Sequence, residues 1–463
     1  MELKKYKLGE ILDVTRGASL SGEFYAAEGE YVRLTCGNFD YQNNCFKENK
    51  AKDNLYYIGD FKPDFLMKEG DIITPLTEQA IGLLGSTAII PESGKYIQSQ
   101  DVAKIVCKEH LLDKDFAFYL ISSNLVKQQL SAAAQQTKIR HTSPDKIKDC
   151  IVWIPELEEQ KRIGKLLRTI DLKIELNRQL NQNLEAMAKQ LYDYWFVQFD
   201  FPDENGKPYK SSGGKMVWDK RLKREIPLLW KAKIVEEVAD VYNGATPSTV
   251  NELNYGGDIV WITPKDLSDQ KQKFVYQGER NISQVGYDSC STHLLPSNTI
   301  LMSSRAPIGL LAIAKTELCT NQGFKSFVSK SKNIATYLYY YLQYHITQIE
   351  QLGTGTTFKE VSREDILKFP MLKPSDNVLD LWEEIVSALN DRQLEIQKEN
   401  ENLIKQRDEL LPLLMNGQVS VNSDLAETGF ILFCISSATK ICFQLIKSII
   451  VNSVLIIAFY INP

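Results

Sequence analysis

The sequence predicts an α+β protein made by internal duplication. Two mixed α/β domains are each followed by a long helix, and the two helices are expected to pair as an antiparallel coiled coil. Three observations predict this fold. Two segments carry apolar residues at seven-residue steps, these segments lie 219 residues apart, and the patterns that precede them also occur twice. Solenoid repeats run to about 20–50 residues, so this much longer offset indicates one duplicated module. A protein with two copies of a module is suited to binding a partner that itself has two sites.

Segments of the same character recur in the same order in both halves of the chain. Each half opens with a strand and a glycine turn, and Gly17 and Gly244 lie 227 residues apart (244 − 17). Alternating runs rich in β-forming residues predict strands, and an aromatic-rich run predicts a helix. The matching pairs are 6–22 with 233–248, 30–40 with 258–269, 65–90 with 293–314, 116–130 with 335–352, and 143–155 with 362–374. Each domain is therefore expected to be mixed α/β.

The long helices are expected directly after these domains. Heptads sustained over four or five repeats indicate a coiled-coil seam. Two matched helices in one chain favour internal pairing, and dimerisation between chains is the alternative. Polar residues in the seam are expected to fix its register. The predicted seam residues are Ile163, Leu167, Ile170, Ile174, Asn177, Asn181, Leu184 and Leu191, facing Trp382, Val386, Leu389, Ile396, Asn400, Leu403 and Leu410.

The chain divides into six predicted segments. They are a first domain at 1–155, a helix at 156–199, a connector at 200–227, a second domain at 228–374, a helix at 375–421 and a hydrophobic extension at 422–463. The extension contains an uninterrupted apolar run of about 14 residues, shorter than the roughly 20 that span a bilayer. We therefore favour an appended segment, for instance from a gene rearrangement, over a membrane anchor.

Composition narrows the class of protein. The net charge of −5 weakly disfavours a polyanion-binding surface over the whole chain, although local patches decide binding. The eight cysteines form no C-x-x-C pair and have no histidine at metal spacing, so we expect reduced thiols and no metal site. The first residues, MELKKYKLGE, contain no apolar signal region. These features favour a cytoplasmic protein.

Motifs of catalysis are missing from the sequence. There is no phosphate-binding G-x-x-x-x-G-K-[ST] loop, no G-x-G-x-x-G after a strand, and no Asn-Pro-Pro-aromatic run of adenine methyltransferases. The four histidines, at 110, 141, 293 and 345, are scattered. We therefore expect no catalytic residues in this chain.

Three runs resemble a known family. They are P-x-L-x-EQ-x-x-I at 155–163, LYDYWFVQFDFPDENGKPYKSSGGKMVW at 191–218 and RDELLPLLMNGQVSV at 407–421. With the duplicated domains, they make residues 1–421 resemble the DNA-specificity subunit of type I restriction-modification enzymes. The chain departs from the family in its hydrophobic extension and at Pro374-Ser375, where the second helix lacks the Glu-Glu-Gln entry.

The resemblance implies a division of labour. Each domain is a target recognition domain that reads one half of a bipartite, asymmetric sequence of double-stranded DNA. The helices set the unread spacer and bind two methyltransferase subunits, and restriction and translocase subunits complete the complex. The cofactors S-adenosylmethionine, ATP and Mg²⁺ would belong to those partners, with none in this chain. A helix from about 157 to 197 would be roughly 60 Å long. At about 34 Å per turn of DNA, this length corresponds to between one and two turns.

Candidate DNA contacts are polar side chains on loops beside strands, because such groups bind base edges. In the first domain they are Thr15, Arg16, Ser19, Arg33, Thr35, Asn38, Thr74, Thr77, Glu78 and Gln79. In the second domain they are Thr246, Ser248, Thr249, Thr263, Lys265, Asp266, Ser303, Ser304 and Arg305. We assign Lys138, Arg140, Thr354, Thr356 and Lys359 mainly to phosphate contacts.

Two other functions compete with this one. A self-contained restriction-methylation enzyme is opposed by the missing methyltransferase and nuclease motifs. A coiled-coil scaffold with two protein-binding domains is the stronger alternative. Replacing one domain and determining the protected DNA sequence distinguishes both from a DNA-specificity subunit.

Overall fold

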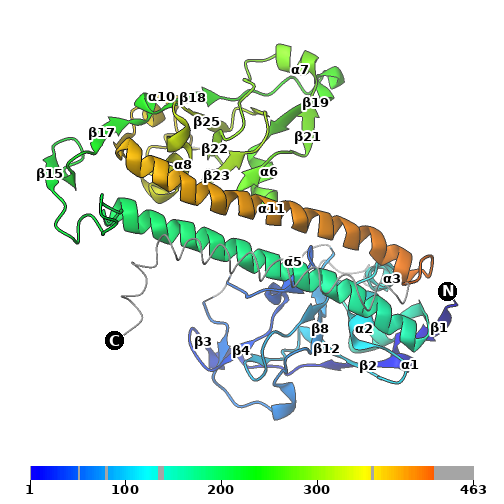
Figure 1. Cartoon of the computed structure of the whole chain (residues 1–463). Helices are drawn as coiled ribbons and strands as arrows, with labels where there is room; N and C mark the ends of the chain where they lie inside the picture. Colours follow the sequence, from blue (N-terminus) through cyan, green and yellow to red (C-terminus); the bar gives the residue numbers. More distant parts are fainter. Residues whose placement is uncertain (1, 51–52, 79–81, 134–139, 356–358, 422–463) are drawn as a thin grey trace. The chain divides into compact units, whose positions relative to one another are not determined.

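The computed structural model describes residues 2–50, 53–78, 82–133, 140–355 and 359–421 (Figure 1). The chain forms two compact units. The first contains residues up to Leu176 together with those from Asn400 onward, and the second runs from Asn177 to Glu399. This division cuts through both long helices, so each unit consists of one α/β domain and a section of the helix pair. The predicted segment boundaries at 155, 199, 227 and 374 stay a prediction.

The first unit contains two four-stranded sheets, besides the two-stranded pairings β1-β14, β5-β6 and β9-β13. One has the strand order β10-β8-β12-β2 and the other β11-β4-β7-β3. The elements are β1 (Lys4–Lys7), α1 (Leu8–Ile11), β2 (Leu12–Arg16), β3 (Tyr25–Ala26), β4 (Tyr31–Arg33), β5 (Phe39–Asp40), β6 (Cys45–Phe46), β7 (Tyr56–Tyr57), β8 (Ile72–Pro75), β9 (Thr77–Glu78), β10 (Ala88–Ile89), β11 (Tyr96–Ile97), β12 (Val102–Cys107), α2 (Lys114–Ile121), α3 (Asn124–Ala133), β13 (Arg140–His141), α4 (Pro144–Lys148) and β14 (Ile151–Ile154). Its core packs α2 and α4 on β2, β12 and the first turns of α5.

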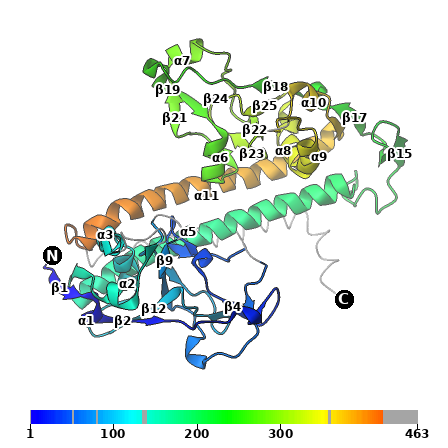
Figure 2. The ribbon, with the colours of Figure 1, turned by 180° about the vertical axis from the view of Figure 1, so that it is seen from behind.

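The second unit repeats this plan. Its two larger sheets have the orders β18-β25-β22-β23-β20 and β21-β19-β24, and Figure 2 shows α8 and α9 beside β22 and β23. The elements are β15 (Met216–Asp219), β16 (Arg224–Pro227), β17 (Lys231–Ile234), β18 (Ala239–Asn243), β19 (Tyr255–Ile262), α6 (Pro264–Gln270), β20 (Phe274–Val275), β21 (Arg280–Ile282), α7 (Gln284–Asp288), β22 (Ile300–Ser304), β23 (Ile308–Ala314), β24 (Cys319–Thr320), β25 (Phe324–Ser329), α8 (Ala335–Tyr344), α9 (Ile346–Gln351), α10 (Arg363–Leu367) and β26 (Pro370–Lys373).

Strand pairing shows that the two domains are copies of one fold. The order β2-β12-β8-β10 corresponds to β18-β25-β22-β23. The strands that close each domain pair in the same register, Lys4 with Ile154 and Lys231 with Lys373. These pairs differ by 227 (231 − 4) and 219 (373 − 154) residues. The predicted duplication of an α/β domain is therefore confirmed.

The two glycine turns are also equivalent. A Cβ atom on Gly17 would lie 2.2 Å from the carbonyl oxygen of Gln98, and one on Gly244 would lie 2.2 Å from that of Asn321. Because no larger residue fits this close approach, both copies need glycine. Gly82 and Gly309, also 227 residues apart (309 − 82), both have positive φ angles, 94° and 96°.

The predicted aromatic-rich helices are each broken in two. In the first unit α2 ends where the hydroxyl groups of Ser122 and Ser123 donate to backbone carbonyls, such as that of Leu120 (2.6 Å from Ser123). These side-chain bonds compete with helix continuation, and α3 starts at Asn124. In the second unit the break falls at His345, between α8 and α9. Periodicity alone did not show either break.

Two long helices follow the domains, as predicted: α5 (Leu157–Tyr192) and α11 (Asp376–Met415). They pack antiparallel within each unit. In the first unit, Asn400 on α11 donates to the carbonyl of Ile174 on α5 (3.4 Å). In the second unit, Asn181 donates to the carbonyl of Gln393 (3.3 Å). The helices therefore pair inside the chain. The absent Glu-Glu-Gln entry does not delay α11, which starts two residues after Pro374.

The two asparagine bonds are equivalent under the duplication. Asn400 corresponds to Asn181 (400 − 181 = 219), and Gln393 corresponds to Ile174 (393 − 174 = 219). In each bond an asparagine amide donates to a main-chain carbonyl of the facing helix. This matched pair fits the predicted role of polar seam residues in fixing register.

The predicted seam residues face inward, with one shift near the end of α5. Most are buried; Asn181, Leu191, Asn400 and Leu410 are half-buried. At the end of α5 the neighbouring Tyr192 is the more deeply buried residue, 3% exposed. A straight α-helix drifts by about 20° per heptad, so the four heptads from Ile163 to Leu191 move the inward face by nearly one residue. A π-helical turn, Asp193–Val197, follows.

The predicted connector is a folded hairpin with an aromatic cluster at its base. Strands β15 and β16 pair antiparallel. Before them, Trp195 and Phe196 lie 6.0 and 4.9 Å from the ring of Trp382 on α11. Phe199 and Phe201 pack on Trp230. The aromatic residues of the 191–218 run therefore fasten the end of α5 to the start of α11 and to the second domain.

Candidate nucleic-acid interface

The same two loops meet at one edge of each domain. In the first unit the amide of Thr142 donates to the carbonyl of Leu76 (2.9 Å), and β9 pairs with β13. In the second unit the amide of Val361 donates to the carbonyl of Ser304 (3.1 Å). The partners differ by 219 (361 − 142) and 228 (304 − 76) residues, so the two contacts are equivalent. We call the residues beside this bond, 76–78 with 140–142 and 304–308 with 359–361, the paired recognition loops.

In the second unit, buried serines shape the turn that carries Arg305. The Ser303 hydroxyl accepts from the amide of Leu310 (2.8 Å) and donates to the carbonyl of Pro307 (2.7 Å). Ser303 and Ser304 have no exposed surface. They were predicted to contact DNA, but their side chains are used inside the domain, and their role here is to hold Arg305 at the surface.

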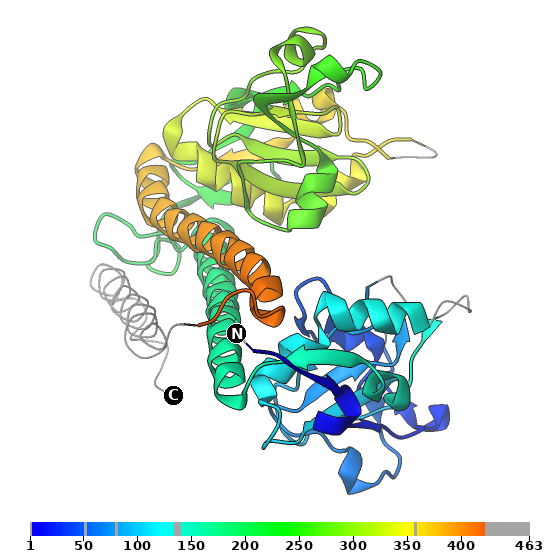
Figure 3. The same cartoon turned by 90° about the vertical axis from the view of Figure 1, so that its right-hand side faces the viewer.

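A chain of charges connects this turn to the neighbouring loop. One Glu360 carboxylate oxygen lies 3.2 Å from the Lys325 amine, and the other lies 3.8 Å from the Arg305 guanidinium. The Lys325 side chain is only 6% exposed, against 36% for Arg305. Thr354 and Glu360 pair as a β-bridge, and Figure 3 shows the segments on either side of 356–358 projecting from the body of the unit. Thr354 and Lys359 are exposed.

In the first unit the facing residues of the equivalent loops are a threonine and a histidine. The Thr77 hydroxyl lies 3.3 Å from Nδ1 of His141. The Glu78 carboxylate accepts from the amide of Gly82 (2.8 Å), which closes its own loop. Thr74 is buried and donates to the carbonyl of Ser86 (2.8 Å). Of these predicted DNA contacts, Thr77 presents its side chain beside the second loop. The hydroxyl of Thr74 is used in a hydrogen bond inside the domain.

The residues predicted to follow the first strand of each domain are exposed, although Thr15 and Arg16 lie within β2 rather than after it. Arg16 donates from Nε to the carbonyl of Gln100 (2.8 Å), which leaves the rest of its guanidinium available. The exposed set is Thr15, Arg16 and Ser19 in the first unit and Thr246, Ser248 and Thr249 in the second. Thr246 donates to the side chain of Gln322. These residues remain candidates for DNA contact.

Residues predicted after the next strand are mostly used within the domains. Arg33 is 8% exposed, stacks on Tyr25 at 3.9 Å and donates to the carbonyl of Asn54 (3.2 Å). Thr35 and Asn38 form a reciprocal cap of a short 3₁₀ turn. These side chains are less suited to binding DNA than the exposed set, because base edges are reached by free polar groups.

The second unit shows the same pattern after its corresponding strand. Thr263 and the buried Asp266 form the capping box of α6. Lys265 is exposed and pairs with Glu279 (2.9 Å). Three predicted contacts, Gln79, Lys138 and Thr356, lie outside the described residues, and Arg140 is described only by its backbone in β13.

Two buried residues without a predicted role, Gln160 and Lys273, fix the domains to the helices. Gln160 accepts from the amide of Asp113 (3.0 Å) and donates to the carbonyls of Leu111 and Pro155. Lys273 donates to Glu185 of α5 (2.6 Å) and to Asn390 of α11 (2.8 Å). Gln160 belongs to the P-x-L-x-EQ run, which was the available signal. Lys273 had no signal in the sequence.

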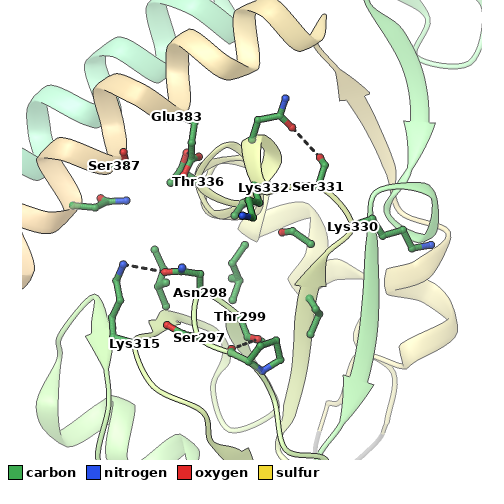
Figure 4. A pocket seen from close by; sticks show the side chains of 18 of the residues that line it. Ser297, Asn298, Thr299, Lys315, Lys330, Ser331, Lys332, Thr336, Glu383 and Ser387 are labelled. Carbon is green, nitrogen blue, oxygen red and sulfur yellow. Dashed lines mark hydrogen bonds between the residues drawn. The ribbon is translucent and has the colours of Figure 1, made fainter.

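A polar cavity of about 830 Å³ lies between the second domain and α11 (Figure 4). Lys315 donates to Asn298 (3.0 Å) on one side, and Thr336 donates to Glu383 (2.5 Å) on the other. Burial lowers the pKa of Lys315 and raises the pKa of Glu383. Both shifts disfavour the charged forms, and the wall combines lysines with acidic residues, unlike a surface selective for a polyanion.

A metal site and a membrane-spanning helix are both absent from the residues that the structure describes. In the described ranges, no cluster of three or more His, Cys, Asp or Glu side chains is arranged to hold a metal ion. Among the helices of those ranges, none is long and apolar enough to span a bilayer. The hydrophobic extension at 422–463 lies outside the described residues.

Comparison with known proteins identifies the family. The model of the type I restriction modification DNA specificity domain matches residues 1–186 and 227–406, which cover most of the chain and both copies of the fold. The chain belongs to this family.

Individual relatives agree with this assignment. The type I restriction enzyme HindI specificity subunit of Haemophilus influenzae is 25% identical over 467 residues, covering 90% of this chain and 99% of that protein. The MjaIX specificity subunit of Methanocaldococcus jannaschii is 35% identical over 197 residues, covering 41% of this chain and about half (46%) of that protein. The crystal structure of the S subunit of a type I system from M. genitalium shares the fold, with a TM-score of 0.58 and 15% identity over 90% of this chain and 96% of that one.

Proposed function

We propose that this chain is the DNA-binding subunit that directs a type I restriction-modification complex to a bipartite, asymmetric sequence. Each domain binds one half of the target through its paired recognition loops. The observation that carries the proposal is the equivalence of these loops. The same main-chain bond joins them in both units, whereas the side chains beside it differ. Two domains of one fold with different surfaces suit a target with two different halves.

The catalytic steps are assigned to partner chains. Two methyltransferase subunits bind the helices and methylate adenine with S-adenosylmethionine, and restriction and translocase subunits use ATP and Mg²⁺. This chain supplies no catalytic group and binds none of these cofactors. Family membership and the missing methyltransferase and nuclease motifs support this division.

The proposal is tested by co-expressing the chain with a modification subunit in a host that lacks other adenine methylation. Methylome sequencing should reveal one bipartite motif with a methylated adenine in each half. The chain expressed alone and the modification subunit expressed alone serve as controls. Methylation that follows no sequence, or that needs only one of the two proteins, would contradict the proposal.

The helix pair is proposed to set the unread spacer. Inserting four residues near Asn181 should lengthen the gap and leave both half-sites unchanged. The structure suggests a gentler version, because Asn181 faces Gln393. Seven residues inserted after each of them add whole heptads, which keep the seam in phase, and about 10 Å of helix. An unchanged gap with either insertion would exclude this role for the helices.

A further inference from the structure

The paired recognition loops place one pair of side chains at equivalent positions in both units. Thr77 directly follows Leu76, whose carbonyl accepts the main-chain bond, as Arg305 follows Ser304. His141 directly precedes Thr142, as Glu360 precedes Val361. Thr77 contacts His141 in the first unit, and Arg305 contacts Glu360 in the second. One structural position therefore holds a threonine–histidine pair in one domain and an arginine–glutamate ion pair in the other.

The difference extends to a third, buried position. In the second unit Lys325 pairs across the sheet with Asn243, and in the first unit Ala103 pairs with Arg16. Because Asn243 corresponds to Arg16 (243 − 16 = 227), Ala103 occupies the place of Lys325. Ala103 is fully buried. Unlike Lys325, it has no charge that could hold a carboxylate at the position where the first unit has His141. The three positions held by Lys325, Glu360 and Arg305 in the second unit are thus held by Ala103, His141 and Thr77 in the first.

Resting on the function proposed above, we propose that these facing pairs determine specificity. Arg305, positioned by Glu360, binds a guanine in one half-site, and Thr77 with His141 contacts a different base pair at the corresponding place in the other half-site. Arginine donates two hydrogen bonds to O6 and N7 of guanine, the commonest specific contact in the major groove.

The contact distances explain why Arg305 is suited to a base. The Glu360 carboxylate is held more closely by the buried Lys325 (3.2 Å) than by Arg305 (3.8 Å). Arg305 can therefore move to a base edge without leaving the carboxylate unpaired. The carboxylate beside it also disfavours approach of a phosphate, because like charges repel at this range. A guanine edge presents acceptors without a net charge.

The test uses the complete complex with the modification subunit, selecting bound and methylated sequences from a randomised library. Arg305→Ala should lose its preference for guanine at one position of one half-site, by about 5- to 150-fold, the discrimination of one bidentate arginine–guanine contact. All positions of the other half-site should keep their preferences. Thr77→Ala should change a single position in that other half-site.

Lys359→Ala is the matched control from the same loop. As a phosphate contact it should weaken binding to all sequences alike and leave base preferences unchanged. Glu360→Gln should reduce the guanine preference less than Arg305→Ala does, because the arginine remains. Since this change leaves buried Lys325 without its counter-ion, the double variant Glu360→Gln, Lys325→Met should show the same loss of preference in a folded protein, checked by thermal unfolding.

The outcomes separate the two proposals. A wild-type complex with no bipartite motif would overturn the proposed function. A wild-type motif together with unchanged base preferences in Arg305→Ala would overturn only the assignment of Arg305. A uniform loss of affinity in Arg305→Ala would make it a phosphate contact and would also overturn that assignment.

Discussion

The two units connect their recognition domains to the long helices at equivalent places but with different charges. In the first unit the Tyr119 hydroxyl donates to Asp171 of α5 (2.5 Å), and Asp171 pairs with Arg407 of α11 (2.9 Å). The position equivalent to Asp171 in the second unit is Asn390 (390 − 171 = 219). The anion of the first copy is thus a neutral amide in the second.

In the second unit the charge comes from elsewhere. Lys273 of the domain is 10% exposed and pairs with Glu185 of α5, and it also contacts Tyr340, Asn390 and Gln393. Duplication therefore preserved the places where domain and helix meet, while the charged groups at these places were redistributed. In both copies the buried charge is compensated within its own unit.

Lys273→Met is expected to have the largest effect on stability. It leaves the Glu185 carboxylate in the interface without its cation, and removing one partner of a buried pair costs about 3–5 kcal/mol. Urea unfolding of the purified chain measures the change. Adding Glu185→Gln removes the uncompensated charge and should recover a large part of the loss. Equal destabilisation in single and double variants would show that packing, not charge, is what Lys273 supplies.

The pH dependence of the same site has a definite sign. Burial lowers the pKa of Lys273 from its ordinary value of 10.5, and Glu185 opposes this effect. Between the lowered pKa and about 10.5 the unfolded chain binds more protons than the folded one, so Lys273 makes stability rise with pH in that window. The Lys273→Met variant lacks this contribution. A wild-type minus variant difference that falls with rising pH in this window would contradict the assignment.

The substitution Gln160→Leu gives the start of α5 the residue that α11 has at the equivalent position. The second copy has Leu379 at this position (379 − 160 = 219), fully buried. In the first copy a leucine would leave the Asp113 amide and two carbonyls without a side-chain partner, at a cost of about 1–3 kcal/mol for each buried unsatisfied group. The conservative Gln160→Met is the size-matched control. Unfolding free energies close to wild type for both variants would show that the bonds of Gln160 contribute nothing.

The seam asparagines should give the smallest effect, and a gain rather than a loss. Asn181→Leu and Asn400→Leu each replace a polar seam residue, which fixes register at a cost in stability, so each should stabilise the chain by about 1 kcal/mol. Asn181 should gain more, because its Oδ1 is buried without a partner among the described residues. Chemical unfolding of both variants tests this order, and a loss of stability in either would show that the bonds do more than fix register.

Much of the fold was predictable because duplication leaves a signal in sequence. The heptads predicted both helices, and the offsets of 219 and 227 recur in the strand register. Periodicity did not predict where the aromatic-rich helices break. The break at Ser122 depends on serine hydroxyl groups that donate to backbone carbonyls, and the second break falls at His345.

The candidate site was predictable only in part. The loops around Thr77 and Arg305 were found, since polar residues follow strands there. Ser303 and Asn38 have the same residue character, but burial and internal bonds occupy them. His141 and Glu360 were missed because their importance comes from contacts with residues about 60 positions away in sequence.

The central claim is that the two domains recognise two different half-sites independently. The most direct measurement replaces residues 1–155 with the corresponding domain of a relative of different specificity and sequences the methylome of the host. One half of the motif should change while the other half and the spacer stay as they were. An unchanged motif, or a change in both halves, would contradict it.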